Sequence, residues 1–180
     1  MGELMPGGRS ASAGVSFVSP RAGADLMSGF PTGVAVITTR CPASGQPYGL
    51  TCSSLVSVTL EPPTLLVSVK SESPVLDAIH RSRAFAVNLL HEHGERAARI
   101  FSTPIPDRFD RINWEPSGAS GIPWLVDDSF ALAECALTET HEVGDHVLTL
   151  GRITRIDGTL QGSPLMYGLR TFASWPGRAD

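Results

Sequence analysis

A long strand–turn–strand pattern near the C-terminal end constrains the fold more than any other feature of this sequence. Residues 130–140 are rich in apolar and β-branched side chains, Val143-Gly144-Asp145 has the composition of a turn, and residues 146–156 run back with the same character. Two strands joined by so short a turn pair antiparallel. Residues 34–39 and 48–53 show a second pattern of this kind, so an antiparallel sheet is predicted.

The remaining segments add short strands and helices to this framework. Further strands are expected at residues 55–59, 64–69, 84–90 and 164–172, and short helices at residues 25–30, 75–79 and 91–103. Residues 104–128 contain four prolines and are expected to form a loop. About seven strands joined mostly by turns favour a mainly β, closed antiparallel barrel over a βαβ sheet. We expect one domain over residues 25–180, preceded by a flexible tail over residues 1–24.

Composition and charge argue against several classes of function. The net charge of −4 indicates no basic surface for nucleic acid, and no apolar run approaches the length of a transmembrane helix. We therefore expect neither nucleic acid nor a membrane as a partner. The three cysteines, at positions 41, 52 and 135, form no Cys-x-x-Cys pair. This pattern favours a reducing compartment, and we expect the protein in the cytoplasm.

The His91-Glu92-His93 triplet suggests a metal site at first sight. No third and fourth ligands follow it at a usable spacing. The start of a solvent-exposed helix is therefore the better interpretation, and no metal is expected.

Small hydroxyl-bearing residues gather in two neighbouring segments. Thr51-Cys52-Ser53-Ser54 ends one strand, where small side chains let backbone N–H groups approach a ligand closely. Lys70-Ser71-Glu72-Ser73 follows a later strand and leads into a helix, with Ser73 as the N-cap and Pro74 at the first position. The helix dipole, the Lys70 ammonium and the hydroxyls would together favour a phosphate. The alternative is that these serines serve only local capping.

Two further patterns concern single polar residues. Asn88 stands alone among the apolar residues of the strand at 84–90, so it is either a satisfied core amide or a ligand contact. Ser53, Asp145 and His146 would supply the groups of a hydrolase triad. No Gly-x-Ser-x-Gly elbow accompanies them, so a hydrolase is not expected.

Five short motifs follow one another over residues 25–172. They are Phe30-Pro31-Thr32-Gly33-Val34, Gly49-Leu50-Thr51-Cys52-Ser53-Ser54, Glu61-Pro62-Pro63, Phe85-Ala86-Val87-Asn88-Leu89 and Gly144-Asp145-His146. In this order and spacing they resemble the short-chain flavin reductases. The resemblance implies a flavin-binding split barrel, usually a homodimer, that passes hydride from NADH or NADPH to FMN or FAD. It also implies a flavin-dependent monooxygenase as the partner that receives the reduced flavin.

The resemblance also implies roles for individual residues. Those that would hold the flavin phosphate and ribityl chain are Thr51, Cys52, Ser53, Ser54, Lys70, Ser71 and Ser73. Thr32 and Asn88 would lie near the flavin ring. Gly144, Asp145 and His146 match the pyridine nucleotide motif, and His146 is expected to position the nicotinamide.

Two segments depart from the family pattern. Cys52 stands where Val, Ala or another small residue is expected, and a buried thiol behaves as a small apolar group. The segment from Tyr167 to Phe172 matches less well, so no aromatic contact is assigned there.

Hydride transfer between cofactors needs no nucleophile or paired carboxylates from the protein. The alternative function is a flavin-binding module without turnover.

Overall fold

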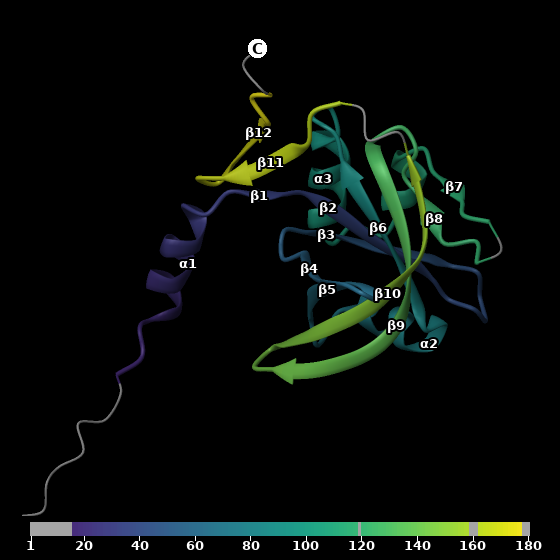
Figure 1. Cartoon of the computed structure of the whole chain (residues 1–180), viewed down its shortest axis with the longest axis horizontal. Helices are drawn as coiled ribbons and strands as arrows, with labels where there is room; N and C mark the ends of the chain where they lie inside the picture. Colours follow the sequence, from purple (N-terminus) through teal and green to yellow (C-terminus); the bar gives the residue numbers. More distant parts are fainter. Residues whose placement is uncertain (1–15, 119, 159–161, 178–180) are drawn as a thin grey trace, which may run out of the picture.

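The computed structural model describes residues 16–118, 120–158 and 162–177. Seven strands form one antiparallel sheet in the order β3-β2-β6-β9-β10-β5-β4 (Figure 1). They are β2 (Ala35–Arg40), β3 (Pro47–Cys52), β4 (Val56–Leu60), β5 (Pro63–Lys70), β6 (Ala84–Leu90), β9 (Ser129–Val143) and β10 (His146–Gly158). The predicted long hairpin is β9–β10. The prediction of a mainly antiparallel β fold is confirmed.

The chain itself joins the two ends of this sheet. β3 and β4 stand at opposite ends of the strand order, yet only residues 53–55 separate them in sequence. Within this link the Ser54 hydroxyl donates to the Ser68 carbonyl of β5 and accepts from the Ser68 N–H, both at 3.3 Å. The link therefore lies beside β5 and brings the two ends of the sheet together, which gives a split barrel in which β3 and β4 remain the end strands.

Apolar side chains from all sides of the barrel fill its interior. Val67 and Val69 of β5 pack in one cluster with Phe85 and Val87 of β6, and each of the four is at most 1% exposed. These residues alternate along their strands with residues on the opposite face of the sheet, which in β6 is also buried, at Ala86 and Asn88. Burial of this apolar surface is the main stabilising contribution to the fold.

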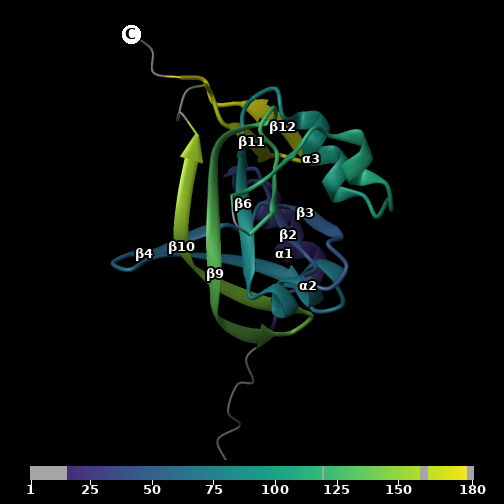
Figure 2. The same cartoon turned by 90° about the vertical axis from the view of Figure 1, so that its right-hand side faces the viewer.

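Helix α2 (Pro74–Ser82) packs against the same interior cluster through Val75, Leu76 and Ile79. It begins as the sequence predicted. The Ser73 hydroxyl accepts a hydrogen bond from the Val75 N–H at 3.3 Å, and Pro74 occupies the first helical position. Figure 2 shows α2 toward one end of the barrel, with α3 and the hairpin β11–β12 toward the other.

Helix α3 (Glu95–Ser102) covers the outer face of β2 and β3 with Ala97, Ala98 and Phe101. Gly49 of β3 allows this contact, because a Cβ there would lie 2.9 Å from the Phe101 ring. The predicted helix at 91–103 begins four residues late. His91 instead pairs with Pro164 in a β-bridge, and its Nδ1 accepts from the His93 N–H.

A small second sheet contains β1 (Thr32–Gly33), β11 (Leu165–Gly168) and β12 (Thr171–Ser174). The single strand predicted at 164–172 is therefore wrong, since the segment turns at Leu169 and Arg170. Both have positive φ, at 50° and 60°. Tight hairpins usually place Gly or Asn at such positions, so the sequence carried no signal for this turn.

Helix α1 (Pro20–Ser28) lies outside the barrel (Figure 1), and no residue in it is buried. The helix expected at residues 25–30 thus begins earlier, because Ser19 caps it and Pro20 occupies its first position. The expected domain boundary at residue 24 falls inside this helix. No helix in the described ranges has both the length and the apolar character needed to cross a membrane.

The predicted loop at 104–128 is mostly irregular. It includes a short 3₁₀ helix η1 (Arg108–Arg111) and the paired segments β7 (Glu115–Pro116) and β8 (Pro123–Trp124). Trp124 packs with Ala86 and Leu132, and so covers the outer face of β6 and β9.

Candidate functional site

Three cavities on one side of the barrel share Ser53. One, of about 180 Å³, is lined by Thr32, Val34 and Leu165, among others. A second, of about 300 Å³, extends toward α3, and a third, of about 470 Å³, extends toward α1 and includes Thr32 and Ser54. The short link between β3 and β4 therefore lies at the centre of a composite recess.

Thr51 and Ser53 reach this recess because alternate residues of β3 face outward. The Thr51 hydroxyl donates to the Ala98 carbonyl of α3 at 2.6 Å. This bond fixes α3 beside the end of β3, and Arg99 and Ser102 of the helix line the same cavity as Thr51. Local strand periodicity thus combines with one tertiary hydrogen bond to place hydroxyl and guanidinium groups together.

Two arginines in this cavity were missed by the sequence analysis. Arg99 comes from α3 and pairs with Glu95, and Arg170 comes from the β11–β12 turn and pairs with Asp25 at 2.5 Å. All four side chains are about half exposed or more, so these pairs contribute little to stability and can exchange for an anionic ligand. No local sequence pattern indicated that Arg99 and Arg170 line one cavity, because the two residues are far apart in the chain.

Aromatic rings form the remaining wall of this cavity. Tyr167 and Phe172 face each other across the β11–β12 hairpin with ring centroids 5.0 Å apart. The Arg99 guanidinium lies 5.0 Å from the centroid of Phe172. The segment for which no aromatic contact was assigned from sequence therefore contributes two rings to the site.

Lys70 and Ser71 lie at the far end of β5, opposite the β9–β10 turn. Lys70 is the register partner of His146, and the Ser71 N–H donates to the Asp145 carbonyl at 3.0 Å. Ser68, two residues before Lys70 on the same face of β5, bonds Ser54. The hydroxyl and lysine segments are therefore connected through β5, while the Ser73 hydroxyl is already used to cap α2.

The β9–β10 turn carries Gly144, Asp145 and His146. Gly144 has a φ of +60°, a conformation that glycine adopts without strain. The hydrogen bond from His146, together with its charge, lowers the pKa of the Asp145 carboxyl, and Lys70 adds to this effect. An ionised carboxylate only accepts, so Nδ1 of His146 carries the proton in this pair and Nε2 stays available to a ligand.

Two residues assigned to the ligand from sequence, Asn88 and Cys52, have side chains in the core. The Asn88 amide is fully buried: it donates to the Val36 carbonyl at 2.9 Å and to Thr38 at 3.1 Å, and accepts from the Leu125 N–H at 2.8 Å. Of its two interpretations, the structure supports the core amide. Cys52 is 4% exposed, and burial raises the pKa of its thiol.

The alternative chemistries receive no support from this geometry. Within the described residues, no hydrogen bond joins Ser53 to His146, whose ring is bonded to Asp145. No cluster of three or more His, Cys, Asp or Glu side chains suited to a metal occurs in the part of the chain that is described.

Fold and site together define a split barrel, with an arginine- and hydroxyl-lined recess on one side and a Gly-Asp-His turn at the end of its long hairpin. The chain matches the family described as "Flavin reductase like domain" over residues 27–176 and belongs to this family.

Known relatives cover most of this chain. It is 49% identical over 150 residues to "Flavin reductase (NADPH)" of Lentzea aerocolonigenes, covering 83% of this chain and 86% of the relative. It is 33% identical over 150 residues to the reductase subunit of a flavin-dependent monooxygenase of Rhodococcus jostii (strain RHA1), covering 83% and 75%.

Solved structures show the same architecture. The NADH:FAD oxidoreductase of Streptomyces globisporus C-1027, in complex with NAD and FAD fragments, superposes with a TM-score of 0.82. It is 30% identical in sequence, and the match covers 92% of this chain and 100% of that protein.

Proposed function

We propose that this protein is an NAD(P)H-dependent flavin reductase that transfers hydride from NADH or NADPH to FMN or FAD. The observation that carries the proposal is the recess around Ser53, which joins two arginines and several hydroxyls in a chain 49% identical to a flavin reductase. The overall reaction converts NAD(P)H, a proton and oxidised flavin into NAD(P)⁺ and reduced flavin.

The residues of the recess suit a flavin. Guanidinium groups and hydroxyls bind phosphate well, and Arg99, Arg170, Ser102 and Ser53 supply both beside one another. The adjoining apolar cavity at Val34 and Leu165 is suited to a planar ring. When bound, the flavin supplies the hydride-accepting ring, and the protein supplies binding and orientation.

His146 and Asp145 are proposed to position the nicotinamide nucleotide. Their hydrogen bond fixes the tautomer and the direction of the imidazole, and Lys70 beside them adds a cation for a phosphate group. No acid or base step is required of this pair. The function of the His146–Asp145 pair is to hold the nicotinamide against the flavin ring, and this orientation accelerates hydride transfer.

Reduced flavin is proposed to leave the protein and to supply a flavin-dependent monooxygenase. The support is that a relative with 33% identity is the reductase subunit of such a monooxygenase, and that Ser53, Arg99 and Arg170 of the recess are exposed. Gel filtration should then remove much of the bound flavin. Turnover that does not depend on added flavin would instead indicate a tightly held prosthetic group.

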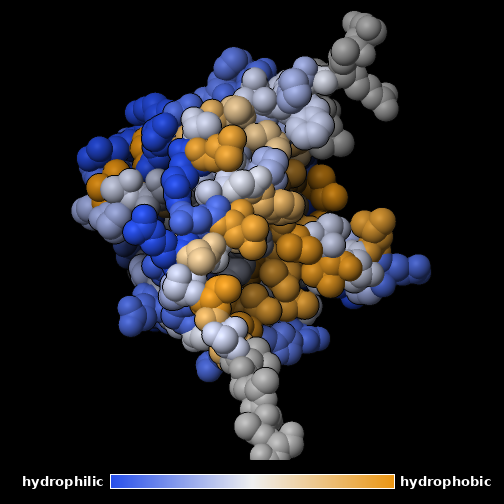
Figure 3. Space-filling view, turned by 90° about the vertical axis from the view of Figure 1, so that its left-hand side faces the viewer, coloured by the Kyte–Doolittle hydropathy of each residue, from blue (hydrophilic) through white to orange (hydrophobic). Residues whose placement is uncertain are grey.

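A homodimer is proposed from the apolar surface on the side that bears α1. Figure 3 shows this surface as a broad hydrophobic area. Exposed apolar residues in α1, β4 and the connections beside them are Leu26, Met27, Phe30, Val56, Val58, Leu60 and Leu169. β4 is an edge strand of the sheet, and such an edge with an apolar face is normally covered by a partner. A second copy would also enclose the adjacent recess.

The cytoplasm is proposed as the compartment, because none of Cys41, Cys52 and Cys135 is in a disulfide.

The activity itself is tested by steady-state oxidation of NADH and NADPH with FMN and FAD each added in turn. Oxidation that requires flavin supports the reductase. Flavin binding without oxidation of either nucleotide would instead indicate a flavin-binding module without turnover.

A further inference from the structure

Asp25 of α1 contacts the flavin recess through Arg170. Its carboxylate accepts a hydrogen bond from the Arg170 guanidinium at 2.5 Å. On the same face of the helix, three residues further on, the Ser28 carbonyl accepts from the Leu169 N–H at 2.6 Å. Both partners belong to the turn between β11 and β12, so one face of α1 lies against this turn.

The strand register brings α1 and this turn together. Thr32 of β1 is the antiparallel partner of Tyr167 of β11. Because the chain enters β1 from α1 and leaves β11 into the turn, the end of the helix and the turn lie on the same side of this strand pair (Figure 1). The contact between Asp25 and Arg170 is therefore built into the small sheet, although the two positions are 145 apart in sequence.

Helix α1 adds little packing to the barrel. None of its residues is buried, and its apolar Leu26 and Met27 are 76% and 58% exposed. Both side chains of the Asp25–Arg170 ion pair are also more than half exposed. An exposed ion pair contributes little to stability, so Asp25 can leave Arg170 without loss of core packing.

Arg170 has its ion-pair partner outside the lining of the recess. Within the part of the chain that the structure describes, no acidic side chain lines any of the three cavities that share Ser53. Arg170 lines two of these cavities, and Arg99 lines one of the two. Helix α1 therefore brings a negative charge to a recess whose own charged side chains are arginines.

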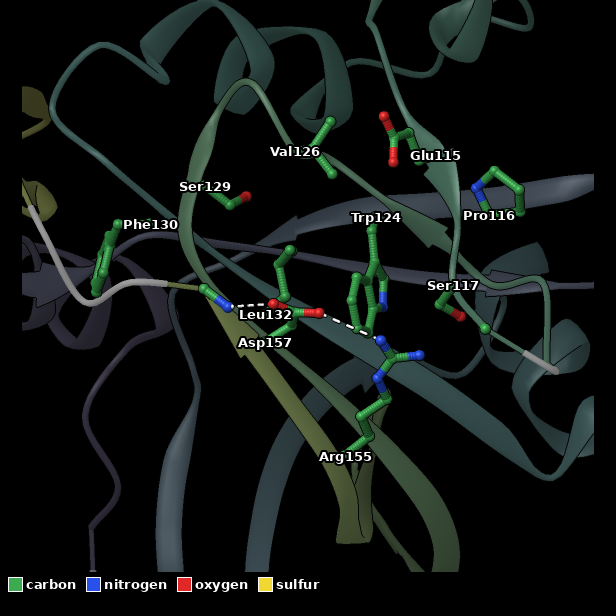
Figure 4. Close-up of a pocket in the computed structure, with 12 residues that line it drawn as sticks. Glu115, Pro116, Ser117, Trp124, Val126, Ser129, Phe130, Leu132, Arg155 and Asp157 are labelled. Atoms are coloured by element: carbon green, nitrogen blue, oxygen red, sulfur yellow. Dashed lines mark hydrogen bonds and ion pairs between the residues drawn. The ribbon is translucent and has the colours of Figure 1, made fainter.

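The large cavity beside Trp124 differs in this respect. It has a volume of about 470 Å³, and Arg155, Glu115 and Asp157 are in its lining. Arg155 donates to Asp157 at 3.2 Å (Figure 4). The single guanidinium of that cavity is thus matched by carboxylates of the same lining, so the recess and not this cavity favours an anionic ligand.

We propose that Asp25 occupies the place of a ligand phosphate on Arg170, so that α1 competes with the flavin for this guanidinium. This inference rests on the proposed flavin reductase function. A carboxylate and a phosphate accept hydrogen bonds from the same guanidinium N–H groups. A phosphate can use Arg170 fully only after Asp25 has moved away, because the two anions repel each other. Helix α1 therefore lowers the affinity for flavin and favours its release.

Asp25→Asn removes the competing charge and keeps the size of the side chain. The variant should bind FMN about threefold to tenfold more tightly than the unaltered protein, and riboflavin, which has no phosphate, equally well. Fluorescence titration measures both dissociation constants. Asp110→Asn is the matched control, because Asp110 is an exposed residue of η1 that lines none of the three cavities.

The Arg170→Ala background tests whether the effect passes through this guanidinium. Arg21 also lies 3.9 Å from Asp25, and Asp25→Asn frees its charge as well. With the Arg170 guanidinium removed, Asp25→Asn should leave the FMN dissociation constant unchanged. A gain in FMN affinity that persists in the Arg170→Ala protein would overturn the proposal.

Inorganic phosphate provides a test without flavin. Phosphate should raise the melting temperature of Asp25→Asn more than that of the unaltered protein or of Asp110→Asn, each compared with sodium chloride at the same ionic strength. Equal phosphate responses in the three proteins would contradict the proposal. Unchanged FMN affinity in Asp25→Asn, or an equal gain for riboflavin, would contradict it as well.

The outcomes for this inference and for the reductase function are separate. Flavin-dependent oxidation of NADH, with no tighter FMN binding in Asp25→Asn, would reject the competition and keep the reductase. Absence of such oxidation, with a larger phosphate response in Asp25→Asn, would reject the reductase and keep the exchange at Arg170. A lower NADH Michaelis constant without tighter FMN binding would assign Arg170 to the nicotinamide nucleotide and reject the competition with flavin.

Discussion

The Asp145 carboxylate lies 2.8 Å from Nδ1 of His146, at the start of β10 and directly after the Gly144 turn. The two residues are adjacent in the chain, and their hydrogen bond favours one direction of the imidazole. Lys70 faces the same residue from β5. The Gly144-Asp145-His146 motif therefore lies at a defined position on the barrel, beside the end of β5.

The first prediction concerns this pair. His146→Ala should raise the NADH Michaelis constant about tenfold, the value of one well-placed hydrogen bond, and leave the FMN dissociation constant nearly unchanged. Asp145→Asn should have a smaller effect in the same direction. Steady-state kinetics and fluorescence titration of FMN separate the two ligands. If His146→Ala keeps wild-type NADH kinetics, the Gly144-Asp145-His146 motif is a turn with no role in binding the nicotinamide nucleotide.

The pKa of Asp145 sets the sign of its pH dependence. Because His146 lowers this pKa in the folded protein, the carboxylate pairing is fully present at neutral pH and is lost only as the pH falls through the lowered value. The Asp145→Asn effect on the NADH Michaelis constant should therefore persist to mildly acidic pH. Measuring that constant in both proteins over a pH series checks this.

The second prediction is that Arg99 and Arg170 bind the flavin phosphate. Arg99→Ala and Arg170→Ala should each raise the FMN dissociation constant about tenfold or more, because each removes a charged hydrogen-bond donor. Riboflavin lacks the phosphate, so its affinity should stay the same. Arg96→Ala is the matched control, since Arg96 is an exposed arginine of α3 that lines none of the three cavities. Equal losses for FMN and riboflavin would mean that these arginines do not contact the phosphate.

The lysine segment provides a competing placement of the same phosphate. Lys70→Ala combined with Ser54→Ala should raise the FMN dissociation constant at least several-fold if the phosphate lies along β5. Titrating this double variant beside the arginine variants decides which set of residues contacts the phosphate. Unchanged FMN binding in the double variant would assign Lys70 to the nicotinamide nucleotide instead.

The third prediction tests the dimer. Val58→Asp places a charge on the exposed edge strand β4, where Val58 is 47% exposed, and should convert the protein to a monomer. Light scattering at micromolar concentration measures the mass. Ile156→Asp is the control, because Ile156 is 68% exposed on β10, outside the proposed interface. A wild-type monomer with full flavin affinity would contradict the dimer.

The fourth prediction concerns the reactivity of the three cysteines. A hydrogen bond with the Ser44 side chain, aided by backbone groups, lowers the pKa of Cys41 to about 7. Burial instead raises the pKa of Cys135 to about 12, and that of Cys52 is also raised. Iodoacetamide should therefore alkylate Cys41 first at neutral pH, faster as the pH rises through 7. Ser44→Ala should slow this reaction, as mass spectrometry of the labelled peptides would show.

The fifth prediction addresses packing inside the barrel. A Cβ at Gly151 would lie 2.5 Å from the Phe85 ring and 2.8 Å from Cβ of Cys135. Gly151→Ala should therefore lower the free energy of unfolding by about 1–3 kcal/mol, the usual cost of overpacking. Gly23→Ala in α1 meets no atom within 4 Å and serves as the control. Denaturant unfolding of both variants measures the difference, and equal midpoints would show that Phe85 moves aside freely.

The sequence by itself determined the local structure and the class of fold. The strand pattern along residues 130–156, interrupted by a Gly-Asp turn, predicted the long hairpin. Ser73 and Pro74 predicted the start of a helix, because capping depends only on residues close in sequence. Such signals arise from neighbours within a few residues, where strand periodicity and capping act. The Gly144-Asp145-His146 motif was instead identified by its resemblance to the short-chain flavin reductases.

Only the tertiary structure decided which distant residues meet. Arg99 and Arg170 share one cavity because a hydrogen bond fixes α3 beside β3, and because the chain turns at two non-glycine residues with positive φ. Asn88 faces the core because Val36 and Leu125 provide its partners. Contacts of this kind depend on barrel closure and on side-chain packing between segments far apart in sequence, so no local pattern records them.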